Sequence, residues 1–186
     1  PQEGNPKPRV WRIPKEQSVV NWLGFLNAGM EQVAKNLSRV DKNLVIGINV
    51  GKNADTPLED AAEDYVRVLE GLAPFASYFV LNTSSPNTPG LRQLNQPRYL
   101  SDLLQEVNRG RNRLTGRGLA RPILLKFSPD HSEAGYLEIL KVAQEFKVDG
   151  IIATNTTTSR NGLEPNFGGL PGGLSGRLLA DRSLQV

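Results

Sequence analysis

The sequence predicts an α/β fold built on a parallel sheet, and three observations indicate it. Short apolar runs alternate with amphipathic helical patterns along the chain, which is typical of βαβ units. The runs are continuously apolar, as strands buried on both faces are. Each run ends in a polar side chain, at Asn49, Asn82, Lys126 and Asn155. A doubly wound sheet and a (β/α) barrel both fit, but four polar strand ends favour a (β/α)8 TIM barrel, which gathers its active site there.

The first 27 residues are predicted to precede the barrel units as an arm, a hairpin and an active-site loop. Four prolines among the first fourteen residues preclude a helix, so this stretch is expected to be extended. Residues 10–13 and 18–21 are predicted to pair as a short hairpin outside the main fold. Residues 28–186 are then expected to hold the barrel units of one partial domain.

The first barrel elements follow from helical and apolar spacing. Met30, Val33, Ala34 and Leu37 recur at helical intervals and predict a helix. Residues 44–48 predict a strand. Thr56 is expected to cap the next helix, with Pro57 at its first position and Glu59 closing a capping box. The buried stripe of that helix is expected to comprise Leu58, Ala61, Ala62, Tyr65, Val66 and Leu69.

Three more strands are predicted at residues 78–81, 123–125 and 150–153. The helices between them have apolar stripes at helical spacing, and Asp130 or Ser132 is expected to cap the second of these helices. A glycine-rich loop at residues 168–176 precedes one more helix. About four βα units are therefore visible, whereas a complete barrel has eight units and roughly 250 residues. The two stripes are Leu100, Leu103, Leu104 and Val107, and Tyr136, Ile139, Leu140 and Ala143.

Composition narrows the possible chemistry. The 186 residues suffice for one core, and 38% hydrophobic with 22% charged residues indicates a globular chain. The absence of cysteine excludes disulfides, thiolate zinc sites and a cysteine nucleophile, and a single histidine argues against a His-rich metal site. No predicted strand ends in a carboxylate, which argues against glycosidase acid pairs and magnesium sites. No apolar run approaches the about 18 residues of a membrane span.

The net charge of +3 includes five arginines between Arg109 and Arg121. No aromatic residues interleave with them as a stacking platform for nucleic acid requires. We therefore assign this group to a solvated helix end and expect no nucleic-acid partner. A mild positive balance suits an anionic small molecule equally well.

Residues 82–91, Asn-Thr-Ser-Ser-Pro-Asn-Thr-Pro-Gly-Leu, follow a buried strand and are the main candidate site. In isolation this loop is more simply explained as an Asx/Ser turn. Its place among converging polar strand ends favours a functional role. With Asn49, Lys126, Asn155 and Thr156 it predicts a pocket of neutral hydrogen-bonding groups and one cation. Such a pocket suits a planar heterocycle, and Lys126 is suited to stabilise negative charge on a reduced flavin.

Six segments along the chain carry a family resemblance: residues 1–6, 47–53, 82–91, 125–130, 153–157 and 172–176. In this order they resemble motifs of the class 2 (quinone-dependent, membrane-associated) dihydroorotate dehydrogenases. The resemblance implies a TIM barrel that binds FMN and oxidises (S)-dihydroorotate to orotate in de novo pyrimidine (UMP) biosynthesis, with a quinone as acceptor. It also implies a peripheral membrane protein of the bacterial cytoplasmic membrane or the mitochondrial inner membrane. The contact with the membrane would be made by N-terminal helices that this chain lacks.

The same resemblance implies a role for each candidate residue. Ser85 would be the base that removes the C5 proton while the C6 hydride passes to flavin N5; class 1 relatives have cysteine there. Thr88 and Phe25, with a water, would relay the proton. The substrate would be held by Asn21, Asn82, Asn87, Asn155 and Thr156. The flavin would be held by Asn49, Lys126, Thr154, Ser175 and Gly176.

Two features depart from the family pattern. Residues 21–26 read Asn-Trp-Leu-Gly-Phe-Leu, where the family usually has Asn-Arg-Met/Tyr-Gly-Phe-Asn. The first and last strands, including the loops for the FMN phosphate, are also missing. An alternative interpretation is therefore a truncated, non-catalytic barrel fragment unable to retain FMN. A tRNA dihydrouridine synthase ranks behind both, because that family uses a cysteine acid.

Overall fold

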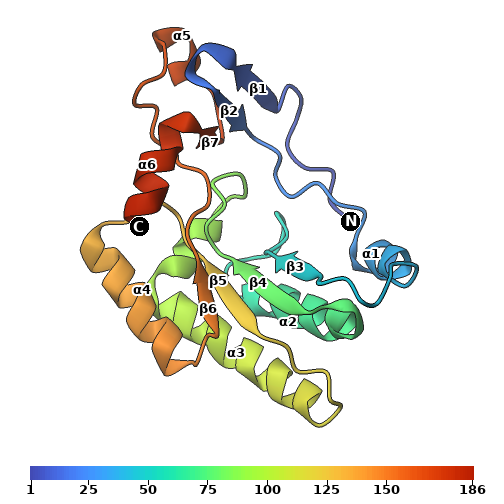
Figure 1. Ribbon diagram of the computed structural model, residues 1–186. Helices are drawn as coiled ribbons and strands as arrows, with labels where there is room; N and C mark the ends of the chain where they lie inside the picture. Colours follow the sequence, from blue (N-terminus) through green and yellow to red (C-terminus); the bar gives the residue numbers. More distant parts are fainter.

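The computed structural model describes all 186 residues and contains two sheets (Figure 1). The larger is a parallel sheet in the order β3-β4-β5-β6, whose strands alternate with helices along the chain. This arrangement confirms the predicted α/β fold. Its strands are β3 Gly47–Val50, β4 Tyr78–Asn82, β5 Ile123–Lys126 and β6 Gly150–Ile152, and the helices between them are α2 Ala61–Leu72, α3 Pro97–Thr115 and α4 Glu133–Glu145.

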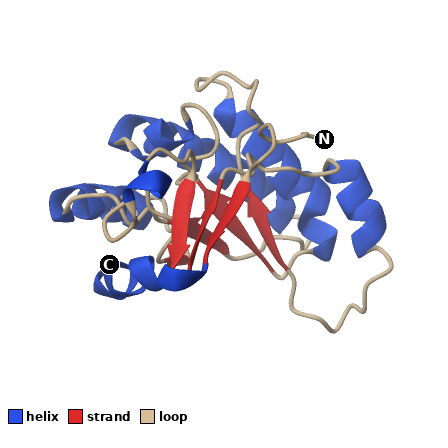
Figure 2. Ribbon diagram, turned by 90° about the horizontal axis from the view of Figure 1, so that it is seen from above, coloured by secondary structure: helices blue, strands red, loops and turns tan.

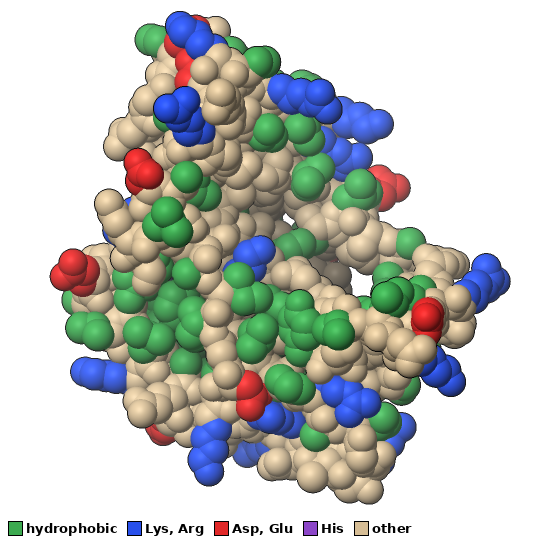
Figure 3. Space-filling view, in the orientation of Figure 1, with side chains coloured by type: hydrophobic (Ala, Val, Ile, Leu, Met, Phe, Trp, Pro, Cys, Tyr) green, Lys and Arg blue, Asp and Glu red, His purple; other side chains and the backbone are tan.

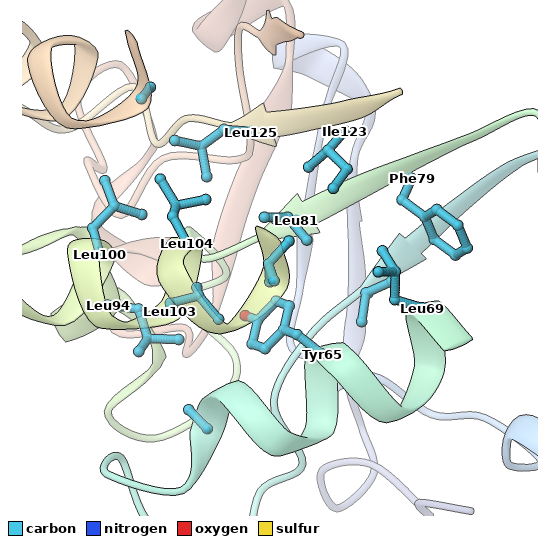
Figure 4. Close-up of a cluster of buried hydrophobic side chains, with 14 of the residues drawn as sticks. Tyr65, Leu69, Phe79, Leu81, Leu94, Leu100, Leu103, Leu104, Ile123 and Leu125 are labelled. Carbon is cyan, nitrogen blue, oxygen red and sulfur yellow. The ribbon is translucent and has the colours of Figure 1, made fainter. Parts of the chain in front are cut away.

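The hydrophobic core lies between one face of this sheet and the helices. Phe79 and Leu81 of β4 point toward the helices, Phe79 beside Leu69 of α2 and Leu81 beside Tyr65 (Figure 4). Truncating a fully buried leucine such as Leu81 to alanine would cost about 2–5 kcal/mol. Because alternate residues of a strand face opposite sides, the residues between these core positions face away from the helices.

The predicted hairpin is confirmed. β1 (Val10–Ile13) pairs with β2 (Ser18–Asn21) through a turn that contains the 3-10 helix η1 (Pro14–Glu16). Gln17 takes the left-handed conformation there, with φ 48°. Ile13 and Val20 pack with Leu174 in a small separate core.

The glycine-rich segment differs from the prediction. Residues 173–176 were expected to be loop, but they form β7 (Gly173–Gly176), which pairs antiparallel with β2. The free edge of β2 offers the hydrogen bonds, and small residues permit the close approach. A side chain at Gly176, whose φ is +100°, would lie 2.5 Å from the Gln17 carbonyl oxygen.

The helix α1 (Met30–Leu37) is confirmed, but the strand after it begins later than predicted. Leu44 and Val45 are exposed, Val45 by 79%, and β3 starts at Gly47. The Ile46 amide donates to Ser77 Oγ at 3.0 Å instead of to a strand. The Ser77 amide donates to the Ile46 carbonyl at 2.7 Å, and the aligned pairs of the ladder begin with Gly47 and Tyr78, so Leu44 and Val45 lie outside it.

The predicted cap of α2 is wrong, because the helix begins at Ala61 after Asp60. The Thr56 carbonyl accepts a hydrogen bond from Lys52 Nζ at 2.6 Å, which holds that stretch in a loop. Ser132 does cap α4, accepting from the Gly135 amide at 3.1 Å. The remaining elements are η2 Ala73–Phe75, η3 Leu91–Asn95, α5 Pro165–Gly168 and α6 Arg177–Gln185.

Seen from above, the strands of both sheets project onto the middle of the molecule and most helices lie around them (Figure 2). The three-stranded sheet lies beyond the C-terminal ends of β4, β5 and β6 (Figure 1). None of the six α-helices has the length and apolar character of a membrane-crossing segment. The division of the chain after residue 27 stays a prediction, since β7 lies in the later part and pairs with the hairpin.

Candidate active site

The candidate residues gather where the parallel strands end. Asn82 is the last residue of β4 and is aligned with Lys126, the last residue of β5. Asn49 in β3 is aligned with Val80, two residues before Asn82. Leu81 and Leu125 point into the core, so Asn82 and Lys126 lie side by side on the opposite face, and Asn49 shares that face. Asn82 and Lys126 therefore end neighbouring strands as predicted, whereas β3 continues to Val50 beyond Asn49 and β6 ends at Ile152, three residues before Asn155.

A first group of polar side chains joins the loops after β4 and β6. Asn155 Nδ2 donates to Asn82 Oδ1 at 3.1 Å and lies equally close to Ser84 Oγ. Asn155 Oδ1 accepts from the Thr156 amide at 2.8 Å. Three predicted substrate residues are thus brought together, although Asn82 and Asn155 are 73 positions apart in the sequence.

A second group surrounds Ser85. The Asn87 amide donates to Ser85 Oγ at 3.2 Å, and Asn87 Nδ2 donates to Asn21 Oδ1 at 2.8 Å. Asn87 Oδ1 and Thr88 Oγ1 are buried and have no hydrogen-bond partner in the protein. Because buried polar atoms without partners are costly, such atoms at a loop cluster indicate a place for a ligand. Ser85 itself is only 7% exposed.

Two glycines let the backbone pass close to both polar groups: Gly172, which precedes β7, and Gly173, its first residue. A side chain at Gly172 would collide with the Asn21 carbonyl and lie 3.0 Å from Asn87 Oδ1. A side chain at Gly173 would collide with Thr156 Oγ1. The backbone can approach both groups only because neither residue has a Cβ.

Lys126 is partly buried and forms no ion pair. Burial lowers the pKa of its ammonium group, because the charged form loses hydration. Its charge is therefore available to a ligand. The other predicted flavin residues make contacts within the protein: Thr154 Oγ1 bonds Ser183 Oγ at 3.1 Å, and Ser175 Oγ donates to the Val19 carbonyl at 3.3 Å. Gly176 directly precedes α6.

The structure does not bring Phe25 into hydrogen-bonded contact with the Ser85 loop, and no hydrogen bond joins Thr88 to Ser85. The Phe25 ring packs against Gly51, where a Cβ would lie 2.8 Å from it. Phe25 and Asn49 instead line a cavity of about 840 Å³ between the N-terminal arm, α1 and β3. Figure 3 shows the molecule hollowed between the N-terminal part and the parallel sheet, with apolar side chains gathered on the sheet side.

Sequence reasoning missed Arg92 and Asp130 as parts of the site. Arg92 Nε donates to the Ser84 carbonyl at 3.2 Å and Nη1 to Asp130 Oδ2 at 3.0 Å. Asp130 also accepts from the amide of Thr158 at 2.9 Å. Asp130 ends the segment 125–130 and Arg92 directly follows the segment 82–91, and both segments resemble family motifs, which is the signal that points to them.

Residues 1–186 match the family model described as dihydroorotate dehydrogenase. A dihydroorotate dehydrogenase (quinone) of Thermus thermophilus is 44% identical over 189 residues, and one of Roseiflexus castenholzii is 46% identical over 187 residues. Both alignments cover 100% of this chain, with 52% and 50% of the respective relative. The chain thus spans about half the length of the curated relatives it matches.

Solved structures agree. The crystal structure of DHODH from Eimeria tenella in complex with ferulenol matches with a TM-score of 0.90 and 34% identity, covering 100% of this chain and 55% of that chain. The ligand-free form from the same organism matches with a TM-score of 0.89 and 33% identity. The chain therefore has the fold of about half of such a barrel.

Proposed function

The chain belongs to the dihydroorotate dehydrogenase (quinone) family, and we propose that its strand-end loops bind dihydroorotate and take part in its FMN-dependent oxidation to orotate. The observation that carries this proposal is the pair of polar groups around Ser85. They combine amide donors, amide acceptors and a buried hydroxyl from the ends of β2 and β4 and from the loops after β4 and β6. None of these amides is hydrogen-bonded to a carboxylate, which would repel an anionic substrate.

The substrate requirements match the amide groups. Dihydroorotate presents a carboxylate and ring carbonyls, which need donors, and ring N–H groups, which need acceptors. Asn87 Oδ1 is a buried acceptor without a protein partner and suits a ring N–H. The proposed substrate set also includes Asn21, Asn82, Asn155 and Thr156. The side-chain amides of the three asparagines can form hydrogen bonds beyond those they make within the protein.

Ser85 is the proposed base that removes the C5 proton. Its Oγ accepts the Asn87 amide at 3.2 Å, which orients the hydroxyl. A serine hydroxyl is a weak base and needs a further acceptor for its own proton. Thr88 Oγ1, buried and free of protein partners, is the proposed next member of that relay. Phe25, with a water, is proposed as a further member of the relay, and its ring packs on Gly51.

The residues present fit a flavin. Asn49 and Lys126 share the sheet face that leads to the site, and Lys126 has no carboxylate to neutralise it. We assign FMN contacts to Asn49, Lys126, Thr154, Ser175 and Gly176. Bound FMN would accept the C6 hydride and deliver the electrons onward. Lys126 would hold positive charge beside the ring, where negative charge develops.

The proposed electron acceptor is a quinone, because the curated relatives from Thermus thermophilus and Roseiflexus castenholzii carry that word in their names. A quinone is dissolved in the membrane, so we propose that the whole protein works at a membrane surface.

The test is the anaerobic reduction of FMN by dihydroorotate on the chain and on Ser85→Ala. Removing a general base slows the step by typically about 10²–10⁴-fold. We expect Ser85→Ala to bind FMN as the parent does and to reduce it at least about 100-fold more slowly. Ser132→Ala, which loses only the cap of α4, should keep the parent rate. A Ser85→Ala protein as fast as the parent would remove Ser85 from the role of base.

A further inference from the structure

One guanidinium group lies where three loops meet. Arg92 Nε donates to the Ser84 carbonyl at 3.2 Å, Nη1 to Asp130 Oδ2 at 3.0 Å, and Nη2 lies 3.5 Å from the Thr156 carbonyl. These partners follow β4, β5 and β6 respectively. A planar guanidinium with five N–H donors can serve several directions at once, which a lysine ammonium on a flexible stem cannot do in one plane.

Asp130 completes the junction from the other side. Its carboxylate accepts from Thr157 Oγ1, from the Thr158 amide at 2.9 Å and from Thr158 Oγ1 at 3.0 Å. Burial by itself would raise the pKa of Asp130. The hydrogen bonds from Thr157 and Thr158 and the charge of Arg92 outweigh it and leave the pKa below its ordinary value. The carboxylate thus stays charged and ties the β5 loop to the β6 loop.

The junction touches the backbone of the site without touching its substrate groups. The Ser84 carbonyl directly precedes Ser85, and the Thr156 carbonyl belongs to a proposed substrate residue. We propose that Arg92 and Asp130 are positioning residues that fix the Ser85 loop relative to the β6 loop. The purpose of this junction rests on the function proposed above, whereas its existence rests on the contacts alone.

The ion pair between Arg113 and Glu70 is more exposed than the pair between Arg92 and Asp130 and serves as a comparison. Arg113 Nε bonds Glu70 at 2.7 Å between α3 and α2, with side chains 58% and 37% exposed. The Arg92 and Asp130 side chains are 29% and 23% exposed. Exposed pairs contribute little because water screens them. Arg113 also donates to no backbone carbonyl, so Arg113→Lys is the matched control for Arg92→Lys.

Hydrogen exchange on the chain itself tests whether the junction orders the loops. Arg92→Lys keeps the charge but loses the planar set of donors. We expect amide exchange in residues 83–91 and 154–159 to rise about tenfold or more, as loss of a charge-assisted hydrogen bond implies. Peptides from α2 and α3 should keep their parent rates in Arg92→Lys, and all segments should keep them in Arg113→Lys. Unchanged loop exchange in Arg92→Lys would overturn the inference.

If Arg92→Lys also speeds exchange in α2 and α3, Thr158→Val decides. That variant removes the Thr158 hydroxyl, which donates to Asp130 Oδ2 at 3.0 Å and lies 3.5 Å from Arg92 Nη1, and it leaves the ion pair in place. Faster exchange confined to the loops would support the junction, and no change in the loops would overturn it.

Orotate affinity separates positioning from mere structural support. We expect about tenfold weaker orotate binding in Arg92→Lys, with FMN affinity unchanged, and no change in Arg113→Lys. Faster loop exchange with parent orotate affinity would overturn the positioning role. A parent chain that binds no orotate would instead contradict the proposed function, while the exchange data would still decide whether the junction exists.

Discussion

Neutral amides, not charges, surround the proposed base. Asn82, the last residue of β4, and Asn87 in the loop after it flank Ser85, and each is bonded to a partner from a distant part of the chain, Asn155 and Asn21 respectively. Asparagine offers two donors and an acceptor with two lone pairs, so each side chain can hold its partner and a ligand together. The amides are therefore positioned before any substrate arrives, which lowers the cost of binding.

The loop residues also explain which side chains could be inferred from sequence. Asn82 and Lys126 are conspicuous because a polar residue ends a buried apolar strand. Arg92 and Asp130 are not conspicuous, because they are 38 positions apart and neither lies in an apolar pattern. A contact of that kind depends on how the strands are ordered in the sheet, which residue spacing does not reveal.

Lys126→Met tests the cation of the site. The lysine is partly buried without a carboxylate partner, so its charge is expected to act on the cofactor. A hydrogen bond to a charged group contributes about 1.5–3 kcal/mol, so FMN affinity should fall about 10- to 100-fold. Fluorescence titration of FMN measures this. Lys141→Met, an exposed change on α4, is the control, and equal affinities for all three proteins would contradict the assignment.

At the level of elements, the spacing of apolar residues predicted which helical side chains are buried, but it did not predict contacts between loops. The stripe Leu100, Leu103 and Leu104 of α3 is buried as its helical spacing predicts. Thr56 did not become a cap, because Lys52 reaches the Thr56 carbonyl and holds it in the loop before α2. The buried ammonium group of Lys52 donates to three backbone carbonyls, and the spacing of residues in the sequence does not predict these contacts.

β7 illustrates the same limit. Its residues, Gly173 to Gly176, have no alternating apolar pattern, so a loop was the natural expectation. The strand exists because the second edge of β2 lies beside it, about 150 residues earlier in the chain. This pairing is what carries Gly172 and Gly173 to the polar groups of the site.

The tie between the β5 and β6 loops should appear in the pH dependence of stability. The pKa of Asp130 is lower in the folded chain than its ordinary value of 3.8, so its contribution is present above that value and is lost as the pH falls through the folded pKa. Asp130→Asn should therefore be less stable than the parent at neutral pH, by about 1 kcal/mol or more. The difference should shrink as the pH falls below about 4.

Urea unfolding at a series of pH values measures that difference. Asp102→Asn on α3 is the matched control, since the Asp102 side chain is exposed and forms neither a hydrogen bond nor an ion pair. A stability difference between the parent and Asp130→Asn that does not vary with pH would be inconsistent with the shifted carboxyl.

Across the whole molecule, one face of the parallel sheet packs against helices and the other carries the polar candidate residues. The helices α2, α3 and α4 cover one face and supply the core. Asn49, Asn82 and Lys126 lie on the other face, toward the candidate site. Figure 3 shows apolar side chains gathered beside the hollow of the molecule. The three-stranded sheet then approaches the strand ends through β7. The site is thus shared between two sheets, and neither sheet alone contains all of its residues.

The most direct test of this account is an anaerobic titration of the purified chain with FMN, followed by dihydroorotate. We predict saturable binding of FMN, then bleaching of its visible absorbance by dihydroorotate, with one orotate formed for each flavin reduced. Ser85→Ala should bind FMN and remain coloured. A parent chain that binds no FMN, or whose bound FMN keeps its absorbance in the presence of dihydroorotate, would contradict the central claim and favour a non-catalytic barrel fragment.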